Sequence, residues 1–227
     1  MTRRLVINNV SQIPQPTIGA EPVVYVIDDD IGVREAVARL FRSVGLRAQL
    51  YNSASELLQS KLPPVPSCLV LDVRMPGLSG FELHAELINA HVDIPIVFIT
   101  AHGDVPMSVR AMKRGAVDFL TKPFRDQDLL EAVTTAIARD RAKRDAERAR
   151  IELKTLFNGL TPREREVMTL VTTGLMNKQI AADIGVSEIT VKIHRMHMMK
   201  KMNAKSIPDL VRMAQTLGIT ESNSRAP

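Results

Sequence analysis

Cysteine is almost absent from this sequence, because Cys68 is the only one among 227 residues. A single cysteine cannot form a disulfide within the chain, so a reducing compartment such as the cytoplasm is expected. Cys68 lies in the apolar run Cys68-Leu69-Val70-Leu71. In such a run a small buried core residue is more typical than a reactive thiol.

Long hydrophobic runs are also missing. The apolar stretches are short, as in Ile96-Val97-Phe98-Ile99, whereas a membrane-spanning helix requires about 20 apolar residues. The first residues include Arg3 and Arg4 but no apolar core of signal-peptide length. The sequence therefore predicts a protein that has no membrane partner.

Charge of neither sign dominates the chain, but it is unevenly distributed. Residues 20–140 carry 12 Lys/Arg and 16 Asp/Glu, residues 141–158 carry 6 and 3, and residues 159–227 carry 10 and 6. An acidic first half followed by a basic second half favours two modules with different partners. The basic surplus is too small to indicate nucleic-acid binding without further signals.

Strand-sized apolar runs alternate with helical patterns in the first half. The predicted strands are residues 23–27, 46–51, 68–71, 95–99 and 117–120. Helical spacing between them predicts apolar faces that include Val37 and Phe41, Leu83 and Leu87, and more loosely Val109, Met112 and Ala116. This alternation predicts an α/β domain, a (βα)5 doubly wound fold whose parallel sheet is covered on both sides.

The second half is expected to be all-α. Residues 139–154 lack Gly and Pro and are rich in Ala, Arg, Lys and Glu, which favours a helix. This helix could be a solvated charged segment or a connector that continues the helix before it and pairs between two chains. At Thr161-Pro162-Arg163-Glu164 a capping box with proline at the first helical position starts a set of short helices.

These patterns divide the chain into five segments. We expect a flexible arm at 1–21, the α/β domain at 22–140, a helical linker at 141–158, a small four-helix domain at 159–220, and a tail at 221–227. Within the helical domain, a short helix at Asn177–Ile184 is followed by the turn Gly185-Val186. Ser187 then caps a longer helix that runs to about Met202, which makes a helix-turn-helix.

Polar residues follow four of the five predicted strands. They are Asp28-Asp29-Asp30, Asp72, Thr100 and Lys122. In an open parallel sheet these strand ends meet at one edge, where ligands bind. Neighbouring carboxylates need a cation, and Mg²⁺ prefers oxygen ligands. A hydroxyl and an ammonium group opposite them suit a phosphoryl group, for which Asp72 is the best candidate nucleophile.

Residues 22–140 resemble a response-regulator receiver domain of the CheY-like fold. The matching motifs are the acidic pair Asp28-Asp29, Asp72-Val-Arg-Met-Pro-Gly-Leu-Ser-Gly, Thr100-Ala101 and Lys122-Pro123. The resemblance implies that Asp29, Asp72 and the carbonyl of Arg74 ligate Mg²⁺ directly and that Asp28 acts through water. It also implies that Asp72 is the phosphoacceptor.

The same resemblance assigns roles to residues around the phosphoryl group. Thr100 would bond a phosphoryl oxygen and Lys122 would pair with it, across a cis Lys122–Pro123 bond. Phe119 falls at the position of the family's switch aromatic. Residues 102–124 further resemble the FixJ branch, in which phosphorylation promotes dimerisation through the fourth helix and fifth strand. Arg110, Lys113 and Arg114 would lie near that face.

The longer helix of the helix-turn-helix has two different sides. Val191, His194 or Arg195, Met198 and Met202 share a largely apolar side, and the other side carries Glu188, Lys192, Arg195 and Lys200. An apolar inner side and a basic outer side suit a helix in the DNA major groove. His194 and His197 have no ligand-spaced cysteine for a zinc site, and Met196, Met198, Met199 and Met202 are expected to be core or boundary residues.

This region resembles the LuxR/NarL/FixJ-type DNA-binding domain through LTPREREV, GLMNKQIA and VSEITVKIHRMHMMKKM. The resemblance implies that Lys192, Ile193 and Met196 read bases, although a basic or polar residue is frequent at the position of Met196. Residues nearer the DNA backbone would be Lys178, Thr190, His194, Arg195, Lys201 and Lys205. The helix from Ser206 to Leu217 would support the reading helix and could pair in a dimer.

Together the two resemblances imply a cytoplasmic transcription regulator of bacterial type. A sensor histidine kinase would phosphorylate Asp72 in the presence of Mg²⁺, and the phosphorylated receiver would dimerise. Two helix-turn-helix units would then bind double-stranded promoter DNA, where RNA polymerase is the further partner. The chain would not be an enzyme beyond the phosphoryl chemistry at Asp72.

Three alternatives remain open from the residues. Asp28-x-Asp30 after an apolar strand resembles haloacid-dehalogenase phosphatases, although Gly32 stands where that family has Thr or Val. The receiver could serve only as a protein-interaction module. The second module could have an output other than DNA, since related helix-turn-helix units dock onto polymerase.

Overall fold

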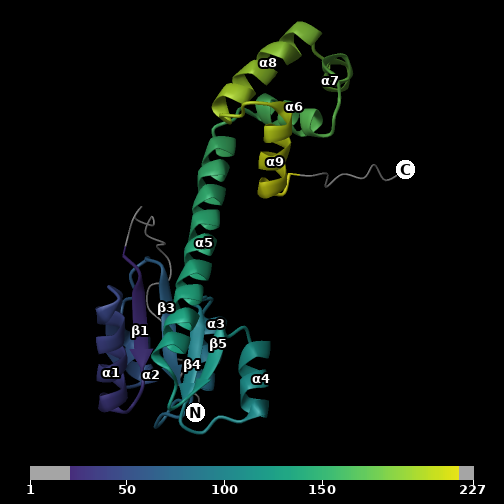
Figure 1. The fold of residues 1–227 in the computed structure, drawn as a ribbon. Coiled ribbons are helices and arrows are strands. Elements are labelled where there is room, and N and C mark those ends of the chain that lie inside the picture. The colour runs from purple at the N-terminus through teal and green to yellow at the C-terminus, as the bar shows by residue number, and fades with distance from the viewer. Residues whose placement is uncertain (1–20, 220–227) are drawn as a thin grey trace. The chain divides into compact units, whose positions relative to one another are not determined.

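The computed structural model describes residues 21–219. The expected arm up to residue 20 and the expected tail at 221–227 therefore lie outside the described residues. The chain divides into two compact units, Met1–Asp145 and Ala146–Pro227, and each is described by itself (Figure 1). Among residues 21–219, no helix is both long enough and apolar enough to cross a membrane.

A five-stranded parallel sheet forms the centre of the first unit. Its strands are β1 (Val23–Ile27), β2 (Arg47–Tyr51), β3 (Ser67–Asp72), β4 (Ile96–Thr100) and β5 (Asp118–Thr121). They lie in the order β2-β1-β3-β4-β5, and every neighbouring pair is parallel. β1, β3 and β4 are buried along their whole length because their near-continuous apolar sequences face helices on both sides.

Five helices cover the two faces of this sheet. They are α1 (Ile31–Ser43), α2 (Ala54–Gln59), α3 (Gly80–Asn89), α4 (Val105–Lys113) and α5 (Asp126–Asn158). Tyr25 and Ile27 pack with residues of α2, α3 and α4 in one core. Val24 and Val26 pack with residues of α1 and α5 in the other. The predicted doubly wound α/β fold is confirmed.

The predicted apolar face around α4 is wrong at Val109 and Met112, whereas Ala116 is buried as expected. Val109 and Met112 are 45% and 48% exposed, and Ala116 lies beyond the end of the helix. Ala111 is instead the fully buried residue of α4, and Met107 packs beside it on the sheet. The small Ala111 lets α4 lie close to the sheet, so the larger apolar residues face outward.

α5 extends without interruption through the predicted linker, so the helical connector that continues the fifth helix is confirmed. The linker residues 141–158 are exposed or half-exposed, as expected of a solvated charged segment, whereas Asp140 just before them is 1% exposed. Its Oδ2 accepts hydrogen bonds from the backbone N of Ser67 at 2.8 Å and from Arg144 Nε at 2.6 Å. Asp140 therefore ties α5 to the first residue of β3.

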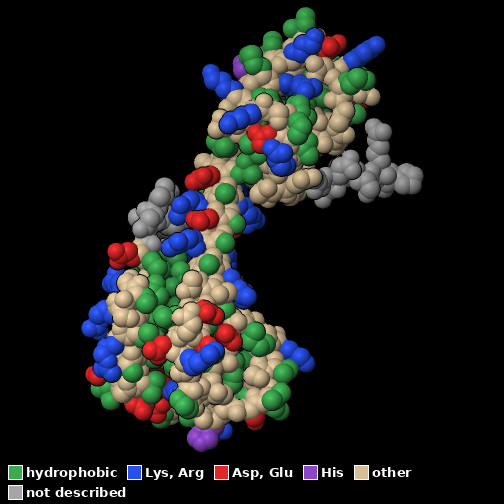
Figure 2. Space-filling view, viewed as in Figure 1, with side chains coloured by type: hydrophobic (Ala, Val, Ile, Leu, Met, Phe, Trp, Pro, Cys, Tyr) green, Lys and Arg blue, Asp and Glu red, His purple; other side chains and the backbone are tan. Residues whose placement is uncertain are grey.

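Four helices make up most of the second unit. They are α6 (Pro162–Thr172), α7 (Asn177–Ile184), α8 (Glu188–Lys201) and α9 (Ile207–Leu217). The predicted capping box at Thr161 and the predicted cap at Ser187 are both present. Val167, Val191 and Met198 belong to one core cluster with residues of α7 and α9. On the face of this unit that Figure 2 shows, Lys and Arg outnumber Asp and Glu.

Candidate functional site

Three carboxylates meet at the carboxyl edge of the sheet. Asp28, Asp29 and Asp72 each place one oxygen within 4.8 Å of the others. β1 and β3 are hydrogen-bonded neighbours, so Asp28 and Asp29 directly after β1 lie beside Asp72 at the end of β3. Asp28 and Asp72 are buried, whereas Asp29 is exposed. The cluster therefore combines hard oxygen ligands with an open side that leaves room for waters, as Mg²⁺ requires.

Lys122 brings a positive charge to these carboxylates from the end of β5. Its Nζ lies 2.6 Å from Asp28 Oδ2 and 3.1 Å from Asp72 Oδ2. Burial acts to lower the pKa of Lys122, but its hydrogen bonds and the two carboxylate charges outweigh burial and raise that pKa. Lys122 therefore keeps its charge at neutral pH. The Lys122–Pro123 bond is cis, as the resemblance implied.

Lys122 does not fully neutralise the negative charge around Asp72. Burial raises the pKa of the Asp72 carboxyl, and Lys122 and the backbone N–H of Arg74, 3.2 Å from Oδ1, offset only part of the rise. The charge of Asp28 raises it further. A divalent cation among the three carboxylates would remove this excess negative charge, so the residues present fit Mg²⁺.

The turn after Asp72 depends on a glycine at its far end. Gly80 begins α3, and its backbone N donates a hydrogen bond to the carbonyl of Val73 at 3.0 Å. A Cβ atom at Gly80 would collide with the backbone carbonyl oxygen of Asp72. The glycine in the expected turn motif is therefore required for α3 to start directly against the end of β3.

Thr100 and Phe119 lie on the neighbouring strands. Asp72 pairs with Ile99, so the fully buried Thr100 stands one position beyond Asp72 on β4. Its Oγ1 accepts a hydrogen bond from the backbone N of His102 at 3.3 Å. A Cβ atom at Gly103 would lie 2.9 Å from Phe119 Cε1 and 3.2 Å from Thr100 Cγ2. Thr100 and Phe119 therefore border the same glycine.

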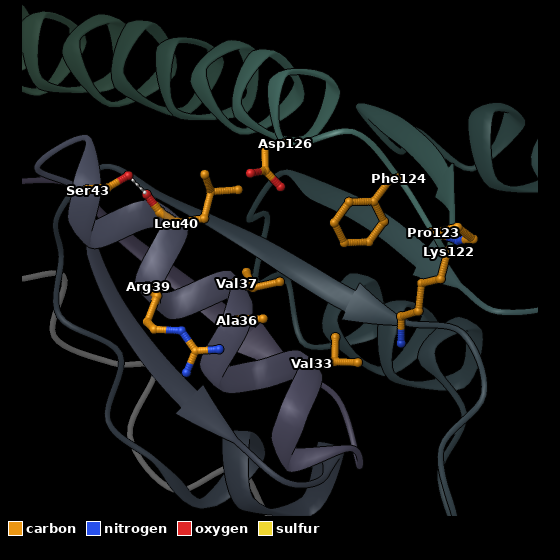
Figure 3. Close-up of a pocket in the computed structure, with 10 residues that line it drawn as sticks. All are labelled: Val33, Ala36, Val37, Arg39, Leu40, Ser43, Lys122, Pro123, Phe124 and Asp126. Atoms are coloured by element: carbon orange, nitrogen blue, oxygen red, sulfur yellow. Dashed lines mark hydrogen bonds between the residues drawn. The ribbon is translucent and has the colours of Figure 1, made fainter.

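A separate groove of about 760 Å³ lies between α1 and the segment that joins β5 to α5. Figure 3 shows Phe124 on one side of it and Val33, Val37 and Leu40 of α1 on the other. Of the predicted site residues, only Lys122 lines this groove. The groove is mostly apolar and is thus distinct from the acidic cluster.

The second unit contains the expected helix-turn-helix. Gly185 has φ 69°, a left-handed conformation that glycine adopts without strain, and it ends α7 directly before α8. Val191, Met198 and Met202 are fully buried, so the predicted apolar side of α8 is confirmed. The predicted DNA-facing residues that are exposed are Lys178, Lys192, Ile193, Met196, Lys201 and Lys205.

Met196 differs from the sequence-based expectation, and the structure decides the side of Arg195. The sequence left Arg195 open between the inner and the outer side, and it is half-buried, with its guanidinium donating a hydrogen bond to Asn177 Oδ1. Thr190 and His194 are also half-buried. Met196 is 60% exposed, so its assignment to the core or boundary is wrong. The buried side of α8 is narrow enough that Met196 falls outside it.

Comparisons with known proteins agree with this arrangement. Residues 24–134 match the family described as response regulator receiver domain, and residues 158–214 match the bacterial regulatory proteins of the luxR family. This chain belongs to the response regulators. It is a DNA-binding regulator of a two-component system, with a receiver domain and a LuxR-type domain.

Individual relatives cover most of the regulator. It is 59% identical to nodulation protein W of Bradyrhizobium diazoefficiens over 89% of each chain. It is 44% identical to the transcriptional regulatory protein FixJ of Azorhizobium caulinodans, over 90% of this chain and 97% of that protein. The solved structure of the response regulator StyR has a TM-score of 0.79 at 47% identity and covers 86% of this chain and 99% of that one.

Sequence reasoning missed a partly buried ion pair in the DNA-binding domain of this regulator. Glu164 is 3% exposed, and Lys201 Nζ lies 2.7 Å from its Oε2. The capping box predicted the local role of Glu164, but nothing in the spacing of residues 164 and 201 pointed to their contact. Lys201 was expected near the DNA backbone, and its charge is instead engaged by α6.

This ion pair predicts acid sensitivity of the DNA-binding domain. Burial acts to raise the pKa of Glu164, but Lys201 and the Thr161 hydrogen bonds outweigh burial and lower that pKa below 4.5. The stabilisation is therefore present above pH 4.5 and is lost as the pH falls through the lowered pKa. We expect Glu164→Gln to remove this loss, since Gln still caps, and to destabilise the domain at neutral pH by at most about 1 kcal/mol.

Hydrogen exchange of peptides from residues 159–217, followed against urea at several pH values, measures this dependence. Glu166→Gln is the matched control, because Glu166 forms an exposed pair with Arg163. An identical pH dependence in wild type and Glu164→Gln would contradict the prediction.

Proposed function

We propose that phosphorylation of Asp72 by a sensor histidine kinase, with Mg²⁺ bound, switches this regulator to a dimer that binds promoter DNA more tightly. One observation carries the proposal. Lys122 Nζ contacts both Asp28 and Asp72 in a cluster of three aspartates. A carboxylate cluster with one ammonium group beside it is what an acyl phosphate and a divalent metal ion together need.

The chain's own residues have separate roles in this reaction. Asp29, Asp72 and the carbonyl of Arg74 would hold Mg²⁺, which supplies charge neutralisation, and Asp28 would act through water. One oxygen of Asp72 attacks the phosphorus atom of a phosphohistidine, and the P–N bond breaks with its electron pair on the imidazole nitrogen, which takes up a proton from water. Lys122 remains protonated and pairs with the phosphoryl oxygens of the product.

The added charge would act on Thr100 and Phe119. A phosphoryl group on Asp72 would draw the Thr100 hydroxyl and Lys122 toward it, since Thr100 ends β4, which pairs with β3, and Lys122 Nζ already lies 3.1 Å from Asp72 Oδ2. Movement of Thr100 frees or occupies the space that it shares with Phe119 beside Gly103. This local change would bias α4 and β5 between two arrangements.

The outer face of α4 supports dimerisation. Val105, Val109 and Met112 are 75%, 45% and 48% exposed along one helix, and such a stripe is typical of a surface that another protein covers. Arg110 and Arg114 stack over the Phe81 ring at 5.0 and 6.0 Å from its centroid, so they hold α4 against α3. A second copy of the chain is the proposed partner.

The proposed dimer acts on DNA in the cytoplasm. Two helix-turn-helix units would occupy adjacent half-sites of a promoter, where RNA polymerase is the further partner. The exposed Lys178, Lys192 and Lys205 support phosphate contacts. The single buried Cys68 is compatible with a reducing compartment.

The phosphatase alternative receives little support from the position of Asp30. Its Oδ1 accepts hydrogen bonds from the backbone N of Gly32 at 2.7 Å and of Val33 at 3.4 Å, so this side chain caps α1. A carboxylate committed to a helix cap is a poor acid for leaving-group protonation. A labelled phosphoryl group on Asp28 in place of Asp72 would favour that alternative.

Promoter footprinting with and without acetyl phosphate and Mg²⁺ tests the proposal. Promoter fragments captured by the full-length protein from genomic DNA are the probes. We expect wild-type occupancy to rise on phosphorylation, and we expect Asp72→Asn to stay at the unphosphorylated level. Unchanged promoter occupancy in Asp72→Asn, with no rise on phosphorylation in either protein, would favour a receiver that is only an interaction module. No footprint in any state would favour an output other than DNA.

A further inference from the structure

The outward side of α8 carries an apolar stripe. Ile189, Ile193 and Met196 are 69%, 47% and 60% exposed, and their spacing of four and three places them on one side of the helix. Figure 2 shows hydrophobic side chains among blue Lys and Arg side chains over this end of the second unit. Single exposed apolar residues are common, but three in a row on the reading helix call for a partner.

Positive charge surrounds this apolar stripe. Lys192 and Lys200 are exposed on the same helix. Lys178 on α7 and Lys205 after α8 are also exposed. Lys192 Nζ lies 3.5 Å from Glu188 Oε1, in an ion pair that is exposed to solvent. A cationic rim around an apolar centre favours DNA, whose phosphates need the rim, over a second apolar protein surface.

α8, all of which the structure describes, lacks the side chains that read adenine with two hydrogen bonds, and its exposed lysines are of the type that reads guanine. Arg or Lys pairs with guanine, and Asn or Gln pairs with adenine. The helix EITVKIHRMHMMKK contains no Asn or Gln, and its one arginine, Arg195, is half-buried against Asn177. The outward side of α8 therefore has lysines at its margins and the apolar side chains of Ile189, Ile193 and Met196 at its centre.

Thymine offers the matching feature in DNA. In the major groove its C5-methyl group is the one apolar group that the four bases present, and side-chain carbon atoms recognise it by contact. We infer that Ile193 and Met196 read thymine methyl groups, so that this regulator selects half-sites with thymines where α8 enters the groove. The inference rests on the proposed function, since it needs α8 in the major groove.

Deoxyuridine provides the test, because it differs from thymidine only by the methyl group. The full-length protein, treated with acetyl phosphate and Mg²⁺, selects duplexes from a randomised pool, and the enriched duplex is resynthesised with one thymidine at a time replaced. At specific positions in each half-site, we expect replacing one thymidine by deoxyuridine to lower the affinity of the protein for the duplex about fourfold. Loss of affinity is measured by titration at fixed salt.

Two substitutions at one position provide the control. Met196→Gln has a similar length but an amide end, and we expect it to lose the methyl dependence at one thymidine and to select adenine there. Met196→Leu keeps the apolar contact, and we expect it to retain the methyl dependence. Both side chains replace an exposed residue, so circular dichroism should show the same helical content.

The possible outcomes distinguish failure of thymine reading from failure of promoter binding. Enrichment of a sequence whose affinity changes by less than about twofold at every deoxyuridine would overturn thymine reading and leave promoter binding intact. Failure to enrich any sequence would overturn both. A Met196→Gln variant with unchanged methyl dependence but an altered oligomeric state would also overturn it, and would assign the stripe to a protein contact.

Discussion

Asp72→Asn should abolish phosphoryl uptake from acetyl phosphate, with a loss of at least about 100-fold in the phosphorylated fraction. An amide oxygen is a poor nucleophile, and an amide also removes one of the three carboxylates that face the metal position. Intact-protein mass spectrometry measures the phosphorylated fraction directly.

Asp30→Asn is the control for this substitution. Asp30 is adjacent to the cluster but caps α1, and Asn caps a helix about as well as Asp. The control therefore removes one negative charge near the site and should keep nearly wild-type phosphorylation. Phosphorylation of Asp72→Asn at the wild-type level would contradict the assignment of Asp72.

Lys122→Met should destabilise the receiver domain when no divalent metal is present. Lys122 is the cation within hydrogen-bond distance of both Asp28 and Asp72, and removing one partner of a buried ion pair costs about 3 kcal/mol. The two carboxylates would then repel each other, so the pKa of Asp72 should rise further above its ordinary value.

Mg²⁺ should restore much of the stability of Lys122→Met. The metal ion would supply the positive charge that the variant lacks, and it would not compete with an ammonium group for the carboxylates. Thermal unfolding with EDTA and with Mg²⁺ measures the effect, and the rise in Tm on adding Mg²⁺ should be larger for the variant than for wild type. Lys113→Met, at the exposed end of α4, should respond like wild type.

Two results would contradict the predictions for Lys122→Met. Equal stability of Lys122→Met and wild type in EDTA would show that the ion pairs with Asp28 and Asp72 contribute little. A variant that Mg²⁺ does not stabilise would argue against a metal site among the three aspartates.

Much of the receiver site was predictable because its residues directly follow strands whose carboxyl ends meet at one edge of the sheet. Short apolar runs such as Cys68-Leu69-Val70-Leu71, alternating with helical patterns, indicate buried parallel strands, and parallel strands bring their carboxyl ends to one edge. Asp28, Asp72 and Lys122 therefore meet although 50 or more residues separate Lys122 from the others. The caps at Thr161 and Ser187 were predictable because their contacts are local.

Other features depended on packing that local patterns do not contain. The spacing of Val109 and Met112 suggested a buried face, but the close approach of Ala111 to the sheet turned them outward. Gly80 and Gly103 mark close approaches between segments that only the folded chain defines.

From its sequence this protein was already recognisable as a parallel-sheet domain with an acidic edge, joined to a helix-turn-helix with a basic side. Those features arise from apolar periodicity, strand ends and helix caps, which are properties of neighbouring residues. Tertiary structure decided the partners of individual charges: Asp140 binds the start of β3, Glu164 holds Lys201, and Arg195 turns back to Asn177. The physical reason is that a charged side chain pairs with whatever the fold brings within about 3 Å, and spacing along the chain carries no record of that neighbour.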